Sequence, residues 1–348
     1  MRLRGWRPRR EDVLAVISGA CLGLLVRYLL SGPAIQNKHV TALNIIAPVV
    51  SIGFLAIVPM SMGYLSVQEY LRATPVEQIN GYKWFFLPWA SVTLSMFVAA
   101  LVGWEGSICI LFAAPIMLLF SMVGGIVARM VWGRFGVNSP GRASAFAVPL
   151  LVLLIEAHIP DPYEIRTVRT EVLIHAPASS VWDNINSVRL IEPTELPQSW
   201  VGRVGFPRPL AATLSHEGVG GVRNATFSGG LTFTETVNRW EPGKDLRFSI
   251  QANTDSIPKS TLDEHVMIGG AFFDVLDGEY TLEERPDGIL LHLSSRERLS
   301  THVNPYAGQW TDAVMRAIQK QILDVIRHRA ESEPGTMEES KRINVLHR

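Results

Sequence analysis

Two hydrophobic patterns divide the chain near residue 160. Before that point, five long apolar runs follow one another, at residues 13–30, 43–65, 84–102, 107–131 and 143–159. Four of them reach the roughly 18–20 residues that a helix needs to cross the core of a bilayer. The fifth run is shorter and contains Pro149, Glu156 and His158, so it is either a fifth span or a re-entrant or interfacial segment. Beyond residue 160, apolar and polar residues alternate over short segments, which predicts β-strands.

The first strand-like segment runs directly into a helical one. At residues 166–174 the apolar face of the alternation comprises Val168, Thr170, Val172 and Ile174. Ala176 and Pro177 end this alternation, and proline is well tolerated in a first helical turn. The apolar residues that follow recur at helical spacing and are Val181, Trp182, Ile185 and Val188. The segment therefore predicts a half-buried strand followed by a short amphipathic helix.

A meander of four strands is predicted next, at residues 211–218, 222–228, 231–240 and 245–252, after an irregular proline-rich segment at 193–209 with a short second helix. Ser228, Gly229 and Gly230 suit a three-residue hairpin loop. The resulting pairs are Phe227 with Leu231, Ala225 with Phe233, and Arg223 with Glu235. A two-residue loop would set apolar residues against threonines. The following turn, at 241–244, sets Val237 opposite Phe248 and Glu235 opposite Ile250.

The last part of the chain predicts a second hairpin and a long helix. Residues 253–270 show little periodicity and suggest a mobile flap. Strands at 272–284 and 289–299 flank the turn at 285–288 and set Leu291, Leu293, Ser295 and Glu297 on the face of Leu282 and Tyr280. Asn304 and Pro305 start a helix to about residue 330. Its apolar stripe is Trp310, Val314, Ile318, Ile322 and Ile326. Residues 331–348 are polar and are expected to be a disordered tail.

This order of elements resembles the SRPBCC superfamily, which includes START-like, Bet v 1-like and polyketide cyclase-like proteins. The resemblance begins with the strand-to-helix junction that carries Ala176, Pro177, Val181 and Trp182, and continues with the segment GVGGVR at 218–223, Phe227 and the segment ETV at 235–237. It implies a helix-grip fold, in which a curved antiparallel sheet wraps around a long C-terminal helix and leaves a hydrophobic cavity. We therefore expect an N-terminal all-α transmembrane bundle at 1–160, a C-terminal α+β helix-grip domain at 161–330, and the tail.

The candidate ligand-binding residues lie on the inward faces of these elements. They are Arg223, Phe233, Glu235, Phe248, Ile250, Tyr280, Glu297, Tyr306 and Trp310. Arg223 and Glu235 are the sharpest polar candidates, because opposed charges on an apolar face can satisfy one another. They form either a polar anchor for a ligand head group or a structural ion pair. Arg239 is also on inward parity.

Composition narrows the function classes. The first 160 residues hold 12 Lys and Arg against 6 Asp and Glu, and the remainder holds 20 against 26. An acidic C-terminal half offers no electrostatic surface for nucleic acid. Cys21 and Cys109 are the only cysteines, and the histidines lack the spacing of a zinc site. The sequence carries no nucleotide-binding glycine motif or serine-hydrolase elbow, so we expect no cofactor, no metal and no identified catalytic residue.

Basic residues in the short loops predict an orientation. Ten Lys and Arg fall on the side of the N-terminus, against Lys38 and Arg27 on the other. We therefore expect an integral membrane protein of a bacterial inner or plasma membrane with a cytoplasmic N-terminus. Five spans place the C-terminal domain outside the cytoplasm, which we expect, whereas four place it inside. Glu105 and Glu156 lie near run ends, where interfacial exposure is expected rather than a transport role.

Three functions fit these features. The first is a membrane-anchored START-like domain whose partners are the lipid bilayer and a hydrophobic small molecule or lipid held in its cavity. The second is a cyclase- or dehydratase-like enzyme that uses Glu235, Arg223 or His302 for acid–base chemistry. The third is an interaction protein that senses a ligand. The expectation leans towards binding rather than catalysis.

Overall fold

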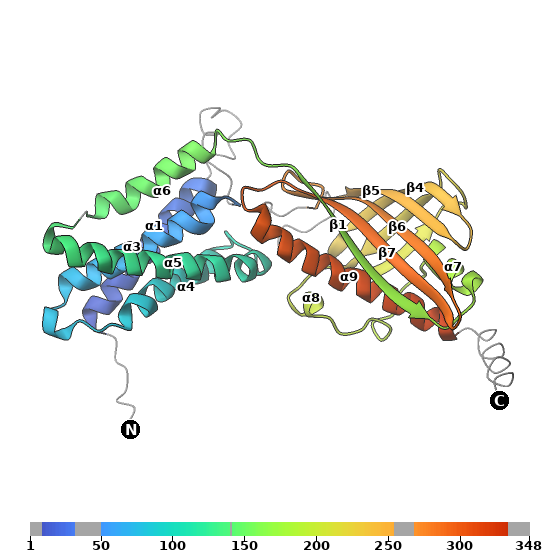
Figure 1. The fold of residues 1–348 in the computed structure, drawn as a ribbon, viewed down its shortest axis with the longest axis horizontal. Helices are drawn as coiled ribbons and strands as arrows, with labels where there is room; N and C mark the ends of the chain where they lie inside the picture. Colours follow the sequence, from blue (N-terminus) through green and yellow to red (C-terminus); the bar gives the residue numbers. More distant parts are fainter. Residues whose placement is uncertain (1–8, 32–49, 140, 254–267, 333–348) are drawn as a thin grey trace, which may run out of the picture. The chain divides into compact units, whose positions relative to one another are not determined.

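The computed structural model describes residues 9–31, 50–139, 141–253 and 268–332. The chain forms two compact units, Met1–Asp161 and Pro162–Arg348. The first is helical, and the second combines a curled sheet with a long helix at its end (Figure 1).

The helices of the first unit follow the predicted apolar runs. They are α1 (Arg10–Ser31), the π-helical turn η1 (Gly53–Ile57), α3 (Val58–Ala73), the 3₁₀ turn η2 (Val76–Gln78), α4 (Lys83–Val102), α5 (Ser107–Phe135), the 3₁₀ turn η3 (Gly136–Asn138) and α6 (Arg142–Glu156). Three helical segments of the described residues are long and apolar enough to cross a membrane: Arg10–Leu30, Lys83–Val102 and Ser107–Asn138.

Two of the predicted spans differ from the structure. The second run was expected to end at residue 65, but α3 continues to Ala73, because Gln68 and Glu69 find partners in Ala128 O and Arg142. Residues 43–49 of that run lie outside the described residues. Helix α6 has 15 residues, or about 22 Å, which is short of the roughly 30 Å bilayer core. The five-span count, and the side of the membrane inferred from it, is therefore not confirmed.

Several ionisable groups among the described residues of the first unit are bonded to partners within it. At the start of α1, Asp12 accepts hydrogen bonds from the Lys83 ammonium at 2.6 and 2.8 Å, and both side chains are buried. Near the end of α1, Arg27 is paired with Glu105. Glu156 is buried and accepts the backbone N–H groups of Ile52 and Gly53 at 2.8 and 2.7 Å. The expected interfacial exposure of Glu105 and Glu156 was thus wrong, since each acts as an internal tie.

Helices α3 and α5 pack with their backbones in near contact. A Cβ added at Gly124 would lie 1.8 Å from Met60 O, and one at Gly63 would lie 1.9 Å from Ser121 O. Only glycine permits so close an approach, which is a common way for helices to associate where both are apolar.

Replacing Gly124 by alanine should therefore destabilise the first unit. The added methyl group must push α3 and α5 apart, and overpacking of this kind costs about 1–3 kcal/mol. Gly133→Ala in the same helix is the matched control, because its Cβ would meet only the flexible Arg129 side chain, at 3.2 Å. Thermal unfolding of the full chain in detergent measures both. Equal melting temperatures for the two variants would contradict the close packing.

The second unit is built on seven strands. They are β1 (Glu164–Ile174), β2 (Pro209–Leu214), β3 (Val222–Phe227), β4 (Thr232–Glu241), β5 (Asp245–Asn253), β6 (Phe273–Arg285) and β7 (Gly288–Leu299). They form one antiparallel sheet in the order β1-β7-β6-β5-β4-β3-β2. The helices are α7 (Ala178–Asn186), α8 (Trp200–Arg203) and α9 (Asn304–Ser332), with the turn η4 (Ser228–Gly230) between β3 and β4. The curled sheet with α9 along it (Figure 1) confirms the helix-grip expectation.

The predicted registers are confirmed in the central strands. Arg223 pairs with Glu235 and Ala225 with Phe233 across β3 and β4. Glu235 pairs with Ile250 and Val237 with Phe248 across β4 and β5, and Tyr280 pairs with Leu293 across β6 and β7. Gly229 has φ 77°, as the three-residue loop requires. The predicted flap lies largely at 254–267, outside the described residues.

Helix α9 is packed unequally along its length. In its second half, Gln319, Gln321, Leu323, Val325, Ile326 and Ala330 are buried. Between Pro305 and Ile318, only Gly308 is buried. The predicted stripe is thus only partly core: Ile326 is buried, whereas Trp310, Val314, Ile318 and Ile322 are half-buried. The predicted cap is also different, because the Asn304 Oδ1 accepts from the backbone and hydroxyl of Thr301, at 2.8 and 2.9 Å.

The second half of α9 joins the main hydrophobic core. This core contains Ile174, Val181, Trp182 and Ile185 from the strand-to-helix junction, together with Phe248, Tyr280, Leu291, Leu323 and Ile326. A second cluster contains Val188, Ala212, Ala225, Phe233 and Val325. The junction between β1 and α7 therefore packs against the second half of α9 in the same core.

Arg329 ties the segment after α7 to the end of α9. Its guanidinium donates to both oxygens of Glu195, at 2.8 and 2.9 Å, and to the carbonyls of Arg189 and Leu190. The hydrogen bonds from Arg329 lower the pKa of Glu195 to about 2.

Arg329→Met should lower the free energy of unfolding by about 1–3 kcal/mol at neutral pH, as expected for hydrogen bonds to a charged group. Because the pKa of Glu195 is lowered on folding, this stabilisation is complete above the ordinary value of 4.5 and is lost as the pH falls through about 2. Arg327→Met is the control, since Arg327 makes an exposed pair with Asp324 within the same helix that is worth little. A wild-type advantage over Arg329→Met that persists unchanged below pH 2 would contradict this interpretation.

Candidate functional site

One row of residues crosses the inner face of the sheet. The registers place Arg223, Glu235 and Ile250 side by side on β3, β4 and β5. They place Val275, Glu297 and Arg166 side by side on β6, β7 and β1. Ile250 comes directly after Ser249, and Val275 lies two residues before Asp277, so both lie just beyond Ser249–Asp277, the last pair that joins β5 and β6. The row is therefore apolar in the middle and charged towards both edges.

The Arg223–Glu235 pair is buried at one end of this row. The Arg223 Nη1 donates to Glu235 Oε2 at 2.5 Å, and the two residues are 4% and 6% exposed. The Arg223 Cζ lies 5.4 Å from the centre of the Phe248 ring and 6.0 Å from that of Tyr280. Such contacts favour a cation over an aromatic ring. The guanidinium thus reaches from β3 across the inner face towards β6.

The Arg223 guanidinium lies over a closely packed ring and has one donor without an acceptor in the described part of the chain. Gly278 makes room for the ring beneath it, because a Cβ there would lie 2.7 Å from the Phe248 Cε2. The Arg223 Nε is buried without a hydrogen-bond partner among the described residues. An unused donor on a buried cation is costly, and a bound molecule with an oxygen acceptor would remove that cost.

Burial acts on the titration of the neighbouring groups. It raises the pKa of the Glu235 carboxyl, and the Arg223 charge opposes that rise. Burial also raises the pKa of the Tyr280 phenol, which keeps this hydroxyl protonated as a donor at neutral pH.

Glu297 is the buried carboxyl at the other end of the row. It is 0% exposed, and neither of its oxygens makes a hydrogen bond of good geometry with a described residue. Burial raises the pKa of Glu297, and an interaction with the Thr311 hydroxyl partly opposes the rise. It therefore differs from Glu235, which has a cation in direct contact.

The charged residues near Glu297 form ion pairs with one another. Arg166 makes a two-pronged contact with Asp312 on α9, with both hydrogen bonds at 2.9 Å, and also pairs with Glu164 at 2.5 Å. Gly308 permits this contact, because a Cβ there would lie 2.6 Å from the Arg166 Cζ. The guanidinium closest in register to Glu297 is therefore already engaged.

A polar tie marks where the two halves of α9 meet. Gln319 donates to the Val168 carbonyl at 3.1 Å and to the Ser295 hydroxyl at 2.9 Å, and accepts from the Thr170 hydroxyl at 3.1 Å. The apolar core lies on its C-terminal side. On its N-terminal side α9 carries Trp310, half-buried and in edge contact with Tyr306 at 6.3 Å between ring centres.

The structure brings together most of the predicted site residues. Arg223, Glu235, Phe248 and Tyr280 form one group, Ile250 adjoins it in the row, and Phe233 packs against Phe227 in the second cluster. Glu297 shares the row, whereas Tyr306 and Trp310 lie on the first half of α9. Phe248 and Tyr280 are also members of the main core, so they support the floor of the site. Sequence reasoning missed Arg166, Asp312 and Gln319, which follow no motif.

Arg239 was wrongly expected to face inward. An irregularity in the ladder between Val237 and Arg239 inserts Asn238 into β4 as a β-bulge. The bulge turns Arg239 to the outer face, where it pairs with Asp245 at 3.2 Å. A second irregularity, between Val275 and Asp277, does the same in β6.

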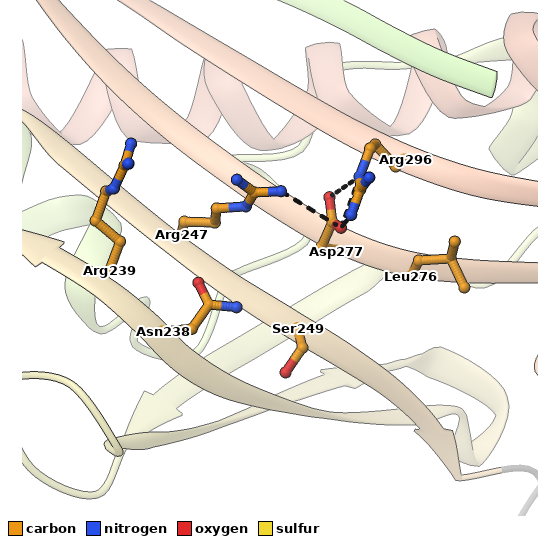
Figure 2. Close-up of a pocket in the computed structure, with 7 residues that line it drawn as sticks. All are labelled: Asn238, Arg239, Arg247, Ser249, Leu276, Asp277 and Arg296. Carbon is orange, nitrogen blue, oxygen red and sulfur yellow. Dashed lines mark hydrogen bonds and ion pairs between the residues drawn. The ribbon is translucent and has the colours of Figure 1, made fainter. Parts of the chain in front are cut away.

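The two bulges shape an open pocket of about 500 Å³ on the outer face (Figure 2). Its lining residues are Asn238, Arg239, Arg247, Ser249, Leu276, Asp277 and Arg296. Asp277 accepts from Arg296 at 2.7 and 3.0 Å and lies 3.8 Å from Arg247. Each of the three arginines has an acidic partner, so the pocket is lined by ion pairs on the solvent-exposed face of the sheet. Among the described residues, no group of three or more His, Cys, Asp and Glu side chains could hold a metal ion.

Comparisons with known proteins give only distant structural likenesses. No protein-family model matches the chain, and no curated protein does. A protein of uncharacterized function from Rhizobium leguminosarum is 12% identical with a TM-score of 0.32, over 50% of this chain and 100% of that one. The di-domain aromatase/cyclase BexL from the BE-7585A pathway is 15% identical with a TM-score of 0.31, over 62% and 64%. Zhui aromatase/cyclase from Streptomyces sp. R1128 is 16% identical with a TM-score of 0.31, over 48% and 94%. These values are too low to transfer a family or a function.

Removing one partner of the buried pair should be far more harmful than removing both. Arg223→Met leaves the Glu235 carboxylate buried without a cation, which costs about 3–5 kcal/mol. The double change Arg223→Met with Glu235→Leu removes both charges and should recover most of that loss. Chemical unfolding of the three proteins measures the difference. If the double variant is as unstable as the single one, the two side chains do not compensate each other.

Proposed function

We propose that the second unit is an SRPBCC-type domain that binds a hydrophobic small molecule or lipid between the inner face of its sheet and the first half of α9. The observation that carries this proposal is the buried Arg223, which is held by Glu235 and the ring of Phe248 and keeps its Nε donor unused. If the pair were purely structural, the Nε–H group would be a buried donor without an acceptor, which is unfavourable. If Arg223 holds a ligand, the same group can donate to a ligand oxygen.

The uneven packing of α9 supports the same proposal. The second half of the helix closes the core, but the side chains of Trp310, Val314 and Ile318 are only half-buried. Apolar side chains that are only partly covered by the protein are typical of a surface that an apolar ligand covers. Ile250 and Val275 supply the apolar middle of the row on the sheet.

Attachment to a bilayer is the second part of the proposal. Segments Arg10–Leu30, Lys83–Val102 and Ser107–Asn138 have the length and apolar composition of spans. Tethering would keep the domain at a high effective concentration near lipid, so a site of modest affinity could stay occupied.

An enzyme of the cyclase or dehydratase kind is the second candidate, and Glu297 is the observation that favours it. Burial raises the pKa of this carboxyl, which favours its protonated form, the form in which a general acid acts. Glu235 suits that role less well, because it is bonded to Arg223.

Mass spectrometry of the full chain tests the binding proposal. Protein purified from membranes in mild detergent should carry a small apolar molecule that organic solvent extracts. The double variant Arg223→Met with Glu235→Leu lacks the polar anchor and should retain about tenfold less of it, equivalent to ~1.4 kcal/mol. Arg296→Met, which removes an arginine paired with Asp277 on the outer face, is the matched control and should retain the molecule fully. Wild-type protein that is empty in every preparation would overturn the proposal.

A further inference from the structure

The described charges of the inner face and of α9 balance without a ligand. Arg223 is paired with Glu235, and Arg166 is paired with both Asp312 and Glu164. The inner row therefore holds no spare positive charge, even before Glu297 is counted. A carboxylate or phosphate placed beside it would be buried without a counter-charge, which is strongly unfavourable.

The surroundings of Glu297 disfavour its ionised form. Val275 beside it on β6 is apolar, Arg166 beside it on β1 is bonded to acidic partners, and Asp312 on α9 adds a further negative charge. Burial and Asp312 both raise the pKa of Glu297, and the Thr311 hydroxyl and the Arg166 charge oppose them. In this setting the protonated acid is a hydrogen-bond donor in need of an acceptor.

We propose that the molecule held by the second unit is uncharged, and that the Glu297 carboxyl donates a hydrogen bond to one of its oxygens, of the ester, ketone or hydroxyl class. This inference rests on the proposed function and specifies its ligand. The unused Arg223 Nε provides a second donor, and a neutral oxygen satisfies it without adding charge.

The sheet geometry sets the scale of the ligand. Phe248, which lies under the Arg223 guanidinium, is in register with Gly278 and, through it, with Ser295 on β7. Two strand spacings and two residues along β7 then separate Phe248 from Glu297, which is roughly 12 Å between Cα positions. A molecule that meets both donors therefore carries oxygens at two points with an apolar body between them, as Ile250 and Val275 require.

Three probes with the same twelve-carbon chain test the inference: methyl laurate, laurate and dodecylammonium. Native mass spectrometry of the full chain at about pH 8, well above the ordinary pKa of a carboxylic acid, measures how much of each is retained. Wild-type protein should retain methyl laurate about tenfold better than laurate, a difference of ~1.4 kcal/mol. Preferential retention of laurate would overturn the inference, as would preferential retention of dodecylammonium, which would make Glu297 an ionised counter-charge.

Variants locate the effect. Glu297→Gln keeps a neutral donor and should retain methyl laurate, whereas Glu297→Leu has none and should lose about tenfold. Glu235→Gln leaves Arg223 with a free positive charge and should shift the preference towards laurate. Equal retention of methyl laurate by Glu297→Leu and wild type would refute the role of Glu297. Failure of wild type to retain any of the three probes would instead count against the proposed function itself.

Discussion

The Arg223–Glu235 ion pair constrains the rest of the second unit. An arginine cannot be buried on an apolar face without an opposite charge, and only one register of β3 and β4 places Glu235 beside it. A slip of one residue between β3 and β4 would set Arg223 and Ala225 opposite threonines and would place Glu235 and Phe233 on the other face of the sheet. The register of β5 follows from that of β4, which brings Phe248 under the guanidinium and Ile250 into the row. The ion pair and the apolar floor of the site are therefore consequences of one alignment.

The two halves of α9 are packed differently against the sheet. Beyond Gln319 the helix closes a core that also contains Trp182 and Ile185 from the opening junction, and Arg329 ties the adjoining segment in place. Before Gln319 the helix meets the sheet through the Arg166–Asp312 contact and leaves its apolar side chains half-buried. Glu297, on β7, is fully buried and is in register with Arg166 of this contact. This difference in packing is the basis of the proposal that the first half of α9 covers a bound molecule.

Much of the fold could be predicted from the sequence because local rules determined it. The glycine pair after Ser228 selected the hairpin loop, and the alternation of apolar residues then fixed which side chains face inward. The bulge at Asn238 shifts the inward position from Arg239 to Trp240, which packs against the main core, so the period of two that placed Arg239 inward does not hold beyond Val237. Arg166, Asp312 and Gln319 were missed because their contacts join β1 to a helix about 150 residues later in the chain.

The first unit shows the same limit. The apolar runs correctly located α1, α4 and α5. The end of α3 was placed too early because Gln68 and Glu69 are polar, and their hydrogen-bond partners, Ala128 O and Arg142, are distant in the sequence. Glu156 was assigned to the membrane interface because the N–H groups that donate to it, those of Ile52 and Gly53, lie more than 100 residues away in the chain. Hydropathy alone does not show which polar residues form hydrogen bonds with partners far away in the chain.

Hydrogen–deuterium exchange of the full chain tests the central claim most directly, that the first half of α9 covers an interior with room for a guest. Peptides from residues 304–318 should exchange faster than those from 319–332 in ligand-stripped protein, and methyl laurate should slow the first set without altering the second. Equal, strong protection of both halves in stripped protein, unchanged by the ester, would mean that the interior is filled by side chains and would contradict the account.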